Sequence, residues 1–304
     1  MIQMLSMLWP VFALLMLGVL ARRLDFPGEA FWPLAEKATY FVLFPVLLVS
    51  RLSQADISGV SVAAIGTGVL LLLLAGSACC YLLRPLLRLP GPSFTSFYQG
   101  AMRFNTYVGL AAVAAIHGAT GVAVSAVVIA FMIPMLNVLC VLVLSYHAGA
   151  SAGLGPVLHN LIRNPLILAC LLGMLLNYSG IGMPAPLRPV AELLGQMALP
   201  LGLLAVGAGL SLRALRQVGP ALLASSSIKL LLFPLLALGI ARLLGLSALG
   251  GSLLVLFASM PTASSAYILA RQLGGDAPMM AAIITGQTLL SALTIPLMLG
   301  WLVS

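Results

Sequence analysis

Residues 99–110 read Gln99-Gly100-Ala101-Met102-Arg103-Phe104-Asn105-Thr106-Tyr107-Val108-Gly109-Leu110 and lie inside an otherwise apolar segment. A second apolar segment is interrupted in a similar way by Ser259-Met260-Pro261-Thr262-Ala263-Ser264-Ser265. We interpret both as helices that break near the middle of a membrane. A break frees backbone polar groups, which lipid cannot satisfy, so it is tolerated only where it is buried in protein or lines a cavity.

The composition is that of a membrane protein. Of the 304 residues, 62% are hydrophobic and 7% are charged, whereas a soluble domain carries about 25% charged residues. The mean hydropathy is +1.17. The long apolar runs favour helices over a barrel, because a barrel strand needs only about 10 alternating residues.

Ten apolar segments indicate an all-α fold with ten transmembrane helices. They span about 5–21, 34–52, 58–83, 94–116, 121–145, 157–177, 193–211, 219–243, 247–271 and 278–303. The first segment lacks a basic region before it and is followed by Arg22-Arg23, which predicts a membrane span rather than a cleavable signal peptide. The four cysteines all lie in apolar segments and are expected to be small buried hydrophobes, and no metal ligands or cofactor motif are predicted.

The cations between the segments predict the orientation. The joints that follow odd-numbered segments hold nine of them: Arg22, Arg23, Lys37, Arg84, Arg88, Arg163, Arg213, Arg216 and Arg271. The opposite joints hold three, Arg51, Arg188 and Arg242. By the positive-inside rule both termini then lie outside the plasma (inner) membrane. Scattered cations of this kind also argue against nucleic-acid binding, despite the net charge of +8.

The spacing of prolines and breaks suggests an internal repeat. Pro45 and Pro200 are 155 residues apart, and Asn105 and Pro261 are 156 apart. Halves of 1–148 and 149–304 would each contain five segments. An odd number of spans makes the second half enter the membrane from the opposite side, which gives the inverted repeat common in secondary transporters.

Crossed half-helices in such a repeat bring two helix N-termini together. Asn105 is a good N-cap, and Pro261 suits the first position of a helix. Helix N-termini attract anions, and all six carboxylates fall in joints or at segment ends, so we expect a cationic interior that binds a carboxylate. The expected binding residues are Arg103, Asn105, Thr106, Asn137, Lys229, Pro261, Thr262, Ser264, Ser265 and Gln287.

Structural roles compete with this assignment. The polar turns are also compatible with hydrogen bonds to a neighbouring helix. Lys229 can be a structural residue bound to carbonyls, Arg103 can extend to the interface, and Asn137 and Gln287 can be interhelical clamps. Pro45 and Pro200 are kinks or face the substrate path.

The string from Arg103 to Leu110 resembles the signature of the auxin efflux carrier family, which includes bacterial malonate-type carriers and plant PIN proteins. Three further strings are similar to that family: Arg163-Asn164-Pro165-Leu166-Ile167, Leu199-Pro200-Leu201-Gly202-Leu203-Leu204 with Gly207, and Met260-Pro261. The resemblance covers nearly the whole chain. One departure is that Phe104 and Thr106 flank Asn105 where some relatives have a proline.

The resemblance implies two inverted five-helix repeats with crossed broken helices four and nine, as in bile-acid and sodium/proton transporters. It implies a scaffold from helices at 5–52 and 157–211 and a transport part from helices at 58–145 and 219–303. It also implies a homodimer formed through the scaffold, and organic anions as substrates.

We therefore expect a secondary efflux carrier for a mono- or dicarboxylate that works by elevator-type alternating access, and not an enzyme. Two alternatives stay open. One is a sodium- or proton-coupled symporter of the bile-acid type, with Asp56 or Glu192 as possible proton carriers. The other is a membrane sensor or structural subunit without flux.

Overall fold

The computed structural model describes residues 2–55, 61–148, 163–217 and 219–302. All regular elements in these ranges are helices, which confirms the all-α prediction. The α-helices are α1 (Ile2–Arg23), α2 (Phe31–Ala38), α3 (Phe44–Leu52), α4 (Val62–Leu87), α5 (Gly91–Met102), α6 (Thr106–Ala148), α8 (Pro165–Tyr178), α9 (Arg188–Gly209), α10 (Pro220–Ser227), α11 (Phe233–Leu243), α12 (Ala248–Ala258), α13 (Ser265–Gln272) and α14 (Ala277–Leu302). A 3₁₀-helix, η2 (Leu212–Gln217), and two π-helical turns, η1 (Thr39–Leu43) and η3 (Ile228–Leu232), complete the order.

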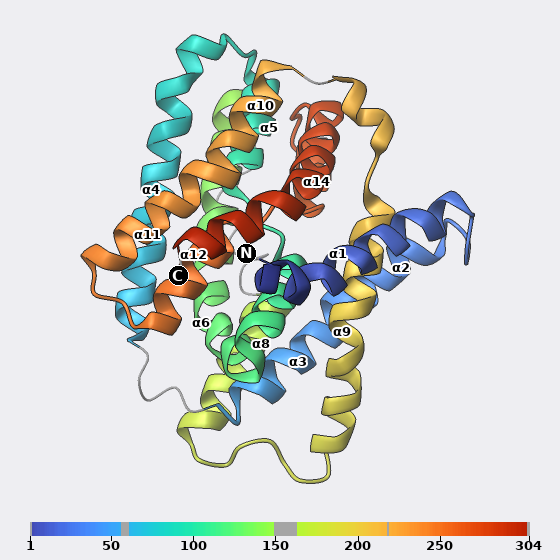
Figure 1. Cartoon of the computed structure of the whole chain (residues 1–304), viewed down its shortest axis with the longest axis vertical. Helices are drawn as coiled ribbons and strands as arrows, with labels where there is room; N and C mark the ends of the chain where they lie inside the picture. The colour runs from blue at the N-terminus through green and yellow to red at the C-terminus, as the bar shows by residue number, and fades with distance from the viewer. Residues whose placement is uncertain (1, 56–60, 149–162, 218, 303–304) are drawn as a thin grey trace.

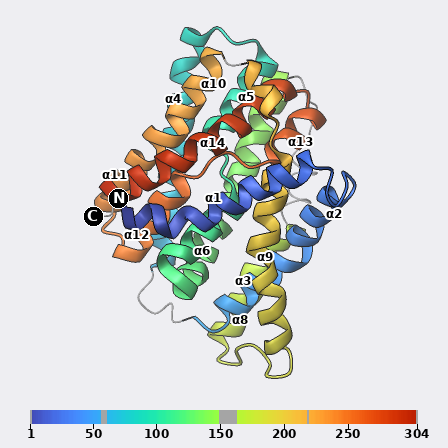
Figure 2. The same cartoon turned by 45° about the vertical axis from the view of Figure 1, so that its right-hand side comes forward.

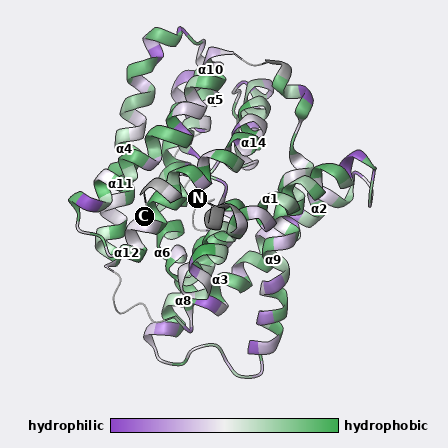
Figure 3. Cartoon of the chain, in the orientation of Figure 1, coloured by the Kyte–Doolittle hydropathy of each residue, from purple (hydrophilic) through white to green (hydrophobic). Residues whose placement is uncertain are grey.

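Seven helical stretches of the described chain are long and apolar enough to cross a membrane. They span 6–23, 31–52, 62–87, 91–148, 188–209, 220–243 and 277–300, and α8 and α12 are shorter apolar helices. Hydrophobic residues cover most of the helices, and hydrophilic residues gather near helix ends and loops (Figure 3). The chain is therefore an integral membrane protein, while the ten-span inverted repeat stays a prediction.

The helices form two groups, which Figures 1 and 2 both show. In the first group α1 and α2 pack against α9, and α3 packs against α8 and α9. In the second group α4 packs against α11, α5 against α10 and α14, and α12 against α11. Helix α6 contacts members of both groups. Helix α6 therefore lies between the two groups, and the site described below lies beside it.

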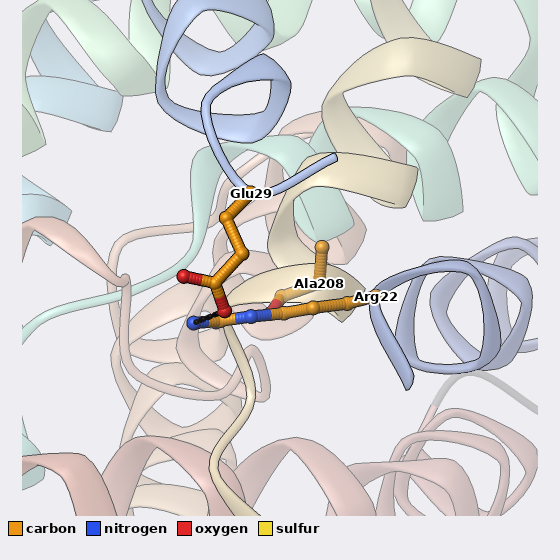
Figure 4. Close-up of polar contacts among 3 residues, drawn as sticks. All are labelled: Arg22, Glu29 and Ala208. Carbon is orange, nitrogen blue, oxygen red and sulfur yellow. Dashed lines mark hydrogen bonds and ion pairs between the residues drawn. The ribbon is translucent and has the colours of Figure 1, made fainter. Parts of the chain in front are cut away.

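Arg22 joins three parts of the first group (Figure 4). Its Nη1 donates a hydrogen bond to the carbonyl oxygen of Ala208 at the end of α9, at 2.7 Å. Its Nη2 lies 3.8 Å from Glu29 Oε1 in the loop before α2. Since Arg22 and Glu29 are largely exposed, we take the ion pair to contribute little to stability. The hydrogen bond fixes the end of α1 against the end of α9.

Each π-helical turn directly precedes a Phe-Pro pair. The N–H of Phe44 bonds to the carbonyl of Thr39, and the N–H of Phe233 bonds to that of Ile228, five residues back in both cases. The following Pro45 has no N–H to offer and its ring crowds the preceding turn, which favours such a widened turn. The predicted kink at Pro45 thus takes the form of a π-turn that contains Tyr40 and Phe41.

Helix α6 contains a sharp bend. Gly118 has φ 60° and ψ −152°, a conformation that side chains other than glycine rarely adopt. The bend falls at the predicted joint between the segments 94–116 and 121–145. Helix α6 therefore consists of two apolar stretches that run in different directions after the break at Asn105.

Candidate functional site

The two predicted breaks are present, and they touch. Helix α5 ends at Met102, residues 103–105 are not helical, and α6 begins at Thr106. Helix α12 ends at Ala258, and α13 begins at Ser265. The backbone N–H of Asn105 donates a hydrogen bond of 2.7 Å to the carbonyl of Pro261. Each break thereby satisfies one backbone group of the other, which lipid could not do.

A buried clamp holds the crossing together. Gln287 of α14 accepts hydrogen bonds from Thr262 N at 3.0 Å and donates one to the carbonyl of Gly100 at 2.9 Å. Thr262 Oγ1 lies 2.7 Å from both Gly100 O and Gln287 Oε1 and donates its proton to one of them. Thr262 and Gln287 are fully buried. These two residues therefore tie the end of α5 to the second break, rather than facing an open space.

A cavity of about 480 Å³ lies beside the crossing. Its polar and charged lining residues are Glu36, Lys37, Arg103, Asn105, Thr106, Asn137, Asn164, Ser264 and Ser265. Its aromatic lining residues are Tyr40, Phe41, Phe104 and Tyr107. Two cations and one carboxylate give the lining a formal charge of +1. A cavity of this kind suits an anion with an apolar body.

Both half-helices begin at this cavity. Asn105 caps α6: its Oδ1 accepts hydrogen bonds from the backbone N–H groups of Tyr107 at 3.0 Å and Val108 at 3.2 Å. The Nδ2 of the same side chain has no hydrogen-bond partner within the described residues, and Asn105 is only 2% exposed. Ser264 directly precedes α13, and its side chain does not cap that helix. The N–H groups of Ala266 and Tyr267 bond to the carbonyls of Ala263 and Ser264. The two helix starts therefore favour negative charge through their dipoles rather than through a row of free donors.

Arg103 bridges the cavity. Its Nη1 lies 3.3 Å from Asn137 Oδ1 of α6, and its Nη2 lies 3.3 Å from Ser265 Oγ at the start of α13. The guanidinium is half-buried and adds a full positive charge beside the two helix starts. Because both hydrogen bonds are long, this guanidinium can exchange them for stronger ones to a carboxylate.

Glu36 corrects the expectation that no carboxylate reaches the interior. It lies on α2, is half-buried, and lines the cavity. Its Oε1 accepts a hydrogen bond of 3.0 Å from Ser264 Oγ. In the sequence Glu36 lies near the end of an apolar segment, and it is one of the six carboxylates from which a cationic interior is expected. The spacing of Glu36 and Tyr40, four residues apart and so on one helix face, was the available signal.

The structure separates the predicted site residues. Arg103, Asn105, Thr106, Asn137, Ser264 and Ser265 line the cavity. Pro261, Thr262 and Gln287 lie at the crossing behind it, and neither Pro45 nor Pro200 is among the lining residues. Lys229 is fully buried in η3, with Nζ 4.7 Å from the centre of the Phe233 ring. Residues that the sequence analysis missed are Glu36, Lys37, Tyr40, Phe104, Tyr107 and Asn164.

No group of three His, Cys, Asp or Glu residues that could hold a metal occurs in the described part of the chain. Asp56 lies outside the described residues, and Glu192 is exposed on α9. Of the carboxylates in the described ranges, only Glu36 is among the lining residues of this cavity.

Comparison with known proteins finds similarity to membrane transporters. Residues 152–299 match a family described as "Membrane transport protein". The chain is 28% identical over 296 residues to a protein of Methanothermobacter thermautotrophicus named "Uncharacterized transporter", with 94% of each chain covered. It is also 28% identical over 305 residues to a Rhizobium meliloti protein named "Putative malonate transporter", covering 94% of this chain and 92% of that protein. The resemblance found in the sequence is thereby confirmed.

Proposed function

We propose that this chain, a membrane transporter of the auxin efflux carrier family, is a secondary carrier for a small organic anion such as a mono- or dicarboxylate. One observation carries the proposal. The starts of α6 and α13 and the guanidinium of Arg103 meet at one cavity that Asn105 also lines, and the buried Nδ2 of Asn105 has no partner among the described residues. A substrate carboxylate supplies the acceptor that these donors lack.

In this proposal the carboxylate binds Asn105 Nδ2, the hydroxyls of Ser264 and Ser265, and Arg103. Thr106 and Asn137 line the remaining polar wall, and the aromatic residues contact the apolar body of the anion. Thr262, Pro261 and Gln287 hold the crossing in shape without touching the anion. Hydrogen bonds to charged groups are roughly twice as strong as neutral ones, so a few such donors suffice to select an anion.

We further propose that the helices at 58–145 and 219–303 form a transport part, which moves past a scaffold made by the helices at 5–52 and 157–211. The grouping of α1, α2, α3, α8 and α9 on one side supports this division. The halves 1–148 and 149–304 would be the inverted repeats. Pro45 and Pro200 would lie on the scaffold along the path, and the scaffold would form the contact of a homodimer in the plasma membrane.

Efflux needs no coupling ion in this proposal. An inside-negative potential drives an anion outward with about 2.3 kcal/mol per charge per 100 mV. Sodium- or proton-coupled symport is the alternative mode, and a sensor without flux is the alternative from another class.

The test starts with purified protein and a panel of carboxylates that includes acetate and malonate. A bound anion raises the melting temperature, because ligand at 100 times its Kd stabilises a protein by about 2.7 kcal/mol. The stabilising anion is then loaded into proteoliposomes. We expect saturable efflux that speeds up when the interior is made negative and that is indifferent to sodium.

Each rival has its own outcome. Flux that requires sodium or a proton gradient would establish a coupled symporter. Binding without flux would establish a sensor. Failure of every carboxylate to stabilise the protein or to cross the membrane would refute the proposed carrier.

A further inference from the structure

The carboxylate of Glu36 accepts a hydrogen bond from a donor at the start of α13. Ser264 Oγ donates to Glu36 Oε1 at 3.0 Å, across 228 residues of sequence. Ser264 is the residue that directly precedes α13, an eight-residue helix whose positive dipole end favours negative charge. The chain therefore already places one carboxylate where a substrate carboxylate would bind.

Asn105, which lines the same cavity, has a buried donor that is not used. Asn105 Nδ2 has no partner within the described residues although the side chain is 98% buried. A buried donor without an acceptor costs roughly 1–3 kcal/mol. Glu36 accepts the hydrogen bond of Ser264 but leaves Asn105 Nδ2 without an acceptor. The arrangement therefore fits a carrier without bound anion, in which Glu36 takes one of the contacts that the substrate carboxylate would make.

We propose that Glu36 is an internal competitor for the substrate carboxylate and sets the affinity of the carrier. This inference rests on the proposed function. In the unliganded protein Glu36 holds Ser264, and an entering anion must displace it, because two carboxylates at one donor repel each other. Lys37 and Arg103, which also line the cavity, provide positive charge for either carboxylate.

The bond also joins the two groups of helices. Glu36 lies on α2, which packs against α9, whereas α13 packs against α5 and α14. Displacement of Glu36 by the anion would release α13 from α2. Substrate binding and release of the transport part would then be the same event.

The first test needs no substrate. Hydrogen–deuterium exchange of residues 259–272 is compared in the wild type, in Glu36→Ala and in Glu29→Ala without added carboxylate. Glu29 is a matched control, because it is a carboxylate in the loop before α2 whose side chain is 79% exposed. We expect faster exchange at the start of α13 in Glu36→Ala alone. Unchanged exchange would show that Glu36 does not hold α13.

The second test measures malonate binding by calorimetry in the wild type, Glu36→Gln and Glu29→Gln. Glutamine keeps the size of the side chain but removes the charge that competes. If Glu36 occupies the site for about nine-tenths of the time, its neutralisation tightens malonate binding about tenfold. Ser264→Ala should remove most of the difference between Glu and Gln at position 36.

The outcomes separate the two ideas. Equal or weaker malonate binding in Glu36→Gln would overturn the competitor role and leave the carrier intact. Absence of malonate binding in every variant would overturn both the competition and this anion as substrate. The exchange experiment would still decide whether Glu36 restrains α13.

Discussion

Asn105 contributes three different groups to the crossing. Its backbone N–H bonds to Pro261, its Oδ1 caps α6, and its buried Nδ2 has no partner among the described residues. Aspartate caps a helix about as well as asparagine does but offers no donor. The capping and the binding roles of this side chain can therefore be separated by one substitution.

Asn105→Asp should fold normally and bind anions poorly. The cap to Tyr107 and Val108 is retained, while the donor is replaced by a negative charge inside the cavity. We expect a melting temperature close to that of the wild type and malonate affinity at least about tenfold lower, equivalent to 1.4 kcal/mol. The two quantities are measured by thermal unfolding and calorimetry.

Ser61→Asp is the control for this substitution. Ser61 caps α4 away from the cavity, where its Oγ accepts a hydrogen bond from the N–H of Ala64. An aspartate there adds the same charge at a helix start and should leave malonate affinity unchanged. Wild-type affinity in Asn105→Asp would remove Asn105 from the binding site.

Local signals in the sequence identified both breaks, but not the residues that face them. Asn105 and Pro261 have capping and helix-start preferences that act within one turn. Glu36 reaches the cavity through a contact with Ser264, and no local pattern encodes that contact. Gln287 shows the same limit. A glutamine amide can hold two helices together or bind a ligand, and only its position behind the crossing decides between these roles.

At the scale of elements, α1 and α9 approach closely because a glycine of each helix faces the backbone of the other. A Cβ on Gly207 of α9 would lie 2.0 Å from the carbonyl oxygen of Leu15 in α1. A Cβ on Gly18 of α1 would lie 2.1 Å from that of Leu204 in α9. Small residues that let backbones touch are the usual basis of helix association in membranes. The α1–α9 pair therefore depends on the absence of side chains at two positions.

Gly207→Ala should separate this pair. The obstacle is backbone rather than a movable side chain, so the helices must shift, which typically costs about 1–3 kcal/mol. We expect a lower melting temperature in detergent, measured with a thiol-independent method such as fluorescence-detected chromatography after heating. Gly239→Ala in α11 is the control, since a Cβ there meets nothing within 4 Å. Equal melting temperatures for both variants would contradict close α1–α9 packing.

The helix bounds were largely predictable, and the bends inside the helices were only partly so. Apolar length and charged joints mark where α14 and the continuous stretch from α10 to α11 begin and end to within a few residues. Pro45 and Pro200 both predicted kinks, yet only Pro45 follows a π-turn. A proline is compatible with several local backbone conformations, and the packing around it selects one of them.

On the scale of the whole molecule, the distribution of arginines and lysines defines two faces. The joint between α4 and α5 belongs to the cation-rich set that predicts the cytoplasmic side, and the joint between α11 and α12 belongs to the opposite set. In Figure 1 the turn after α4 lies at the top, and the turn between α11 and α12 lies lower, at the left. We therefore expect these two loops to lie in opposite compartments.

Single cysteines test this orientation in a variant whose four native cysteines are replaced. Pro90 lies in the joint before α5, Ala248 is the first residue of α12, and both are exposed. Replacing them by cysteine leaves every arginine in place. A membrane-impermeant maleimide should label position 248 in right-side-out vesicles and position 90 only in inside-out vesicles. The opposite pattern would place both termini in the cytoplasm.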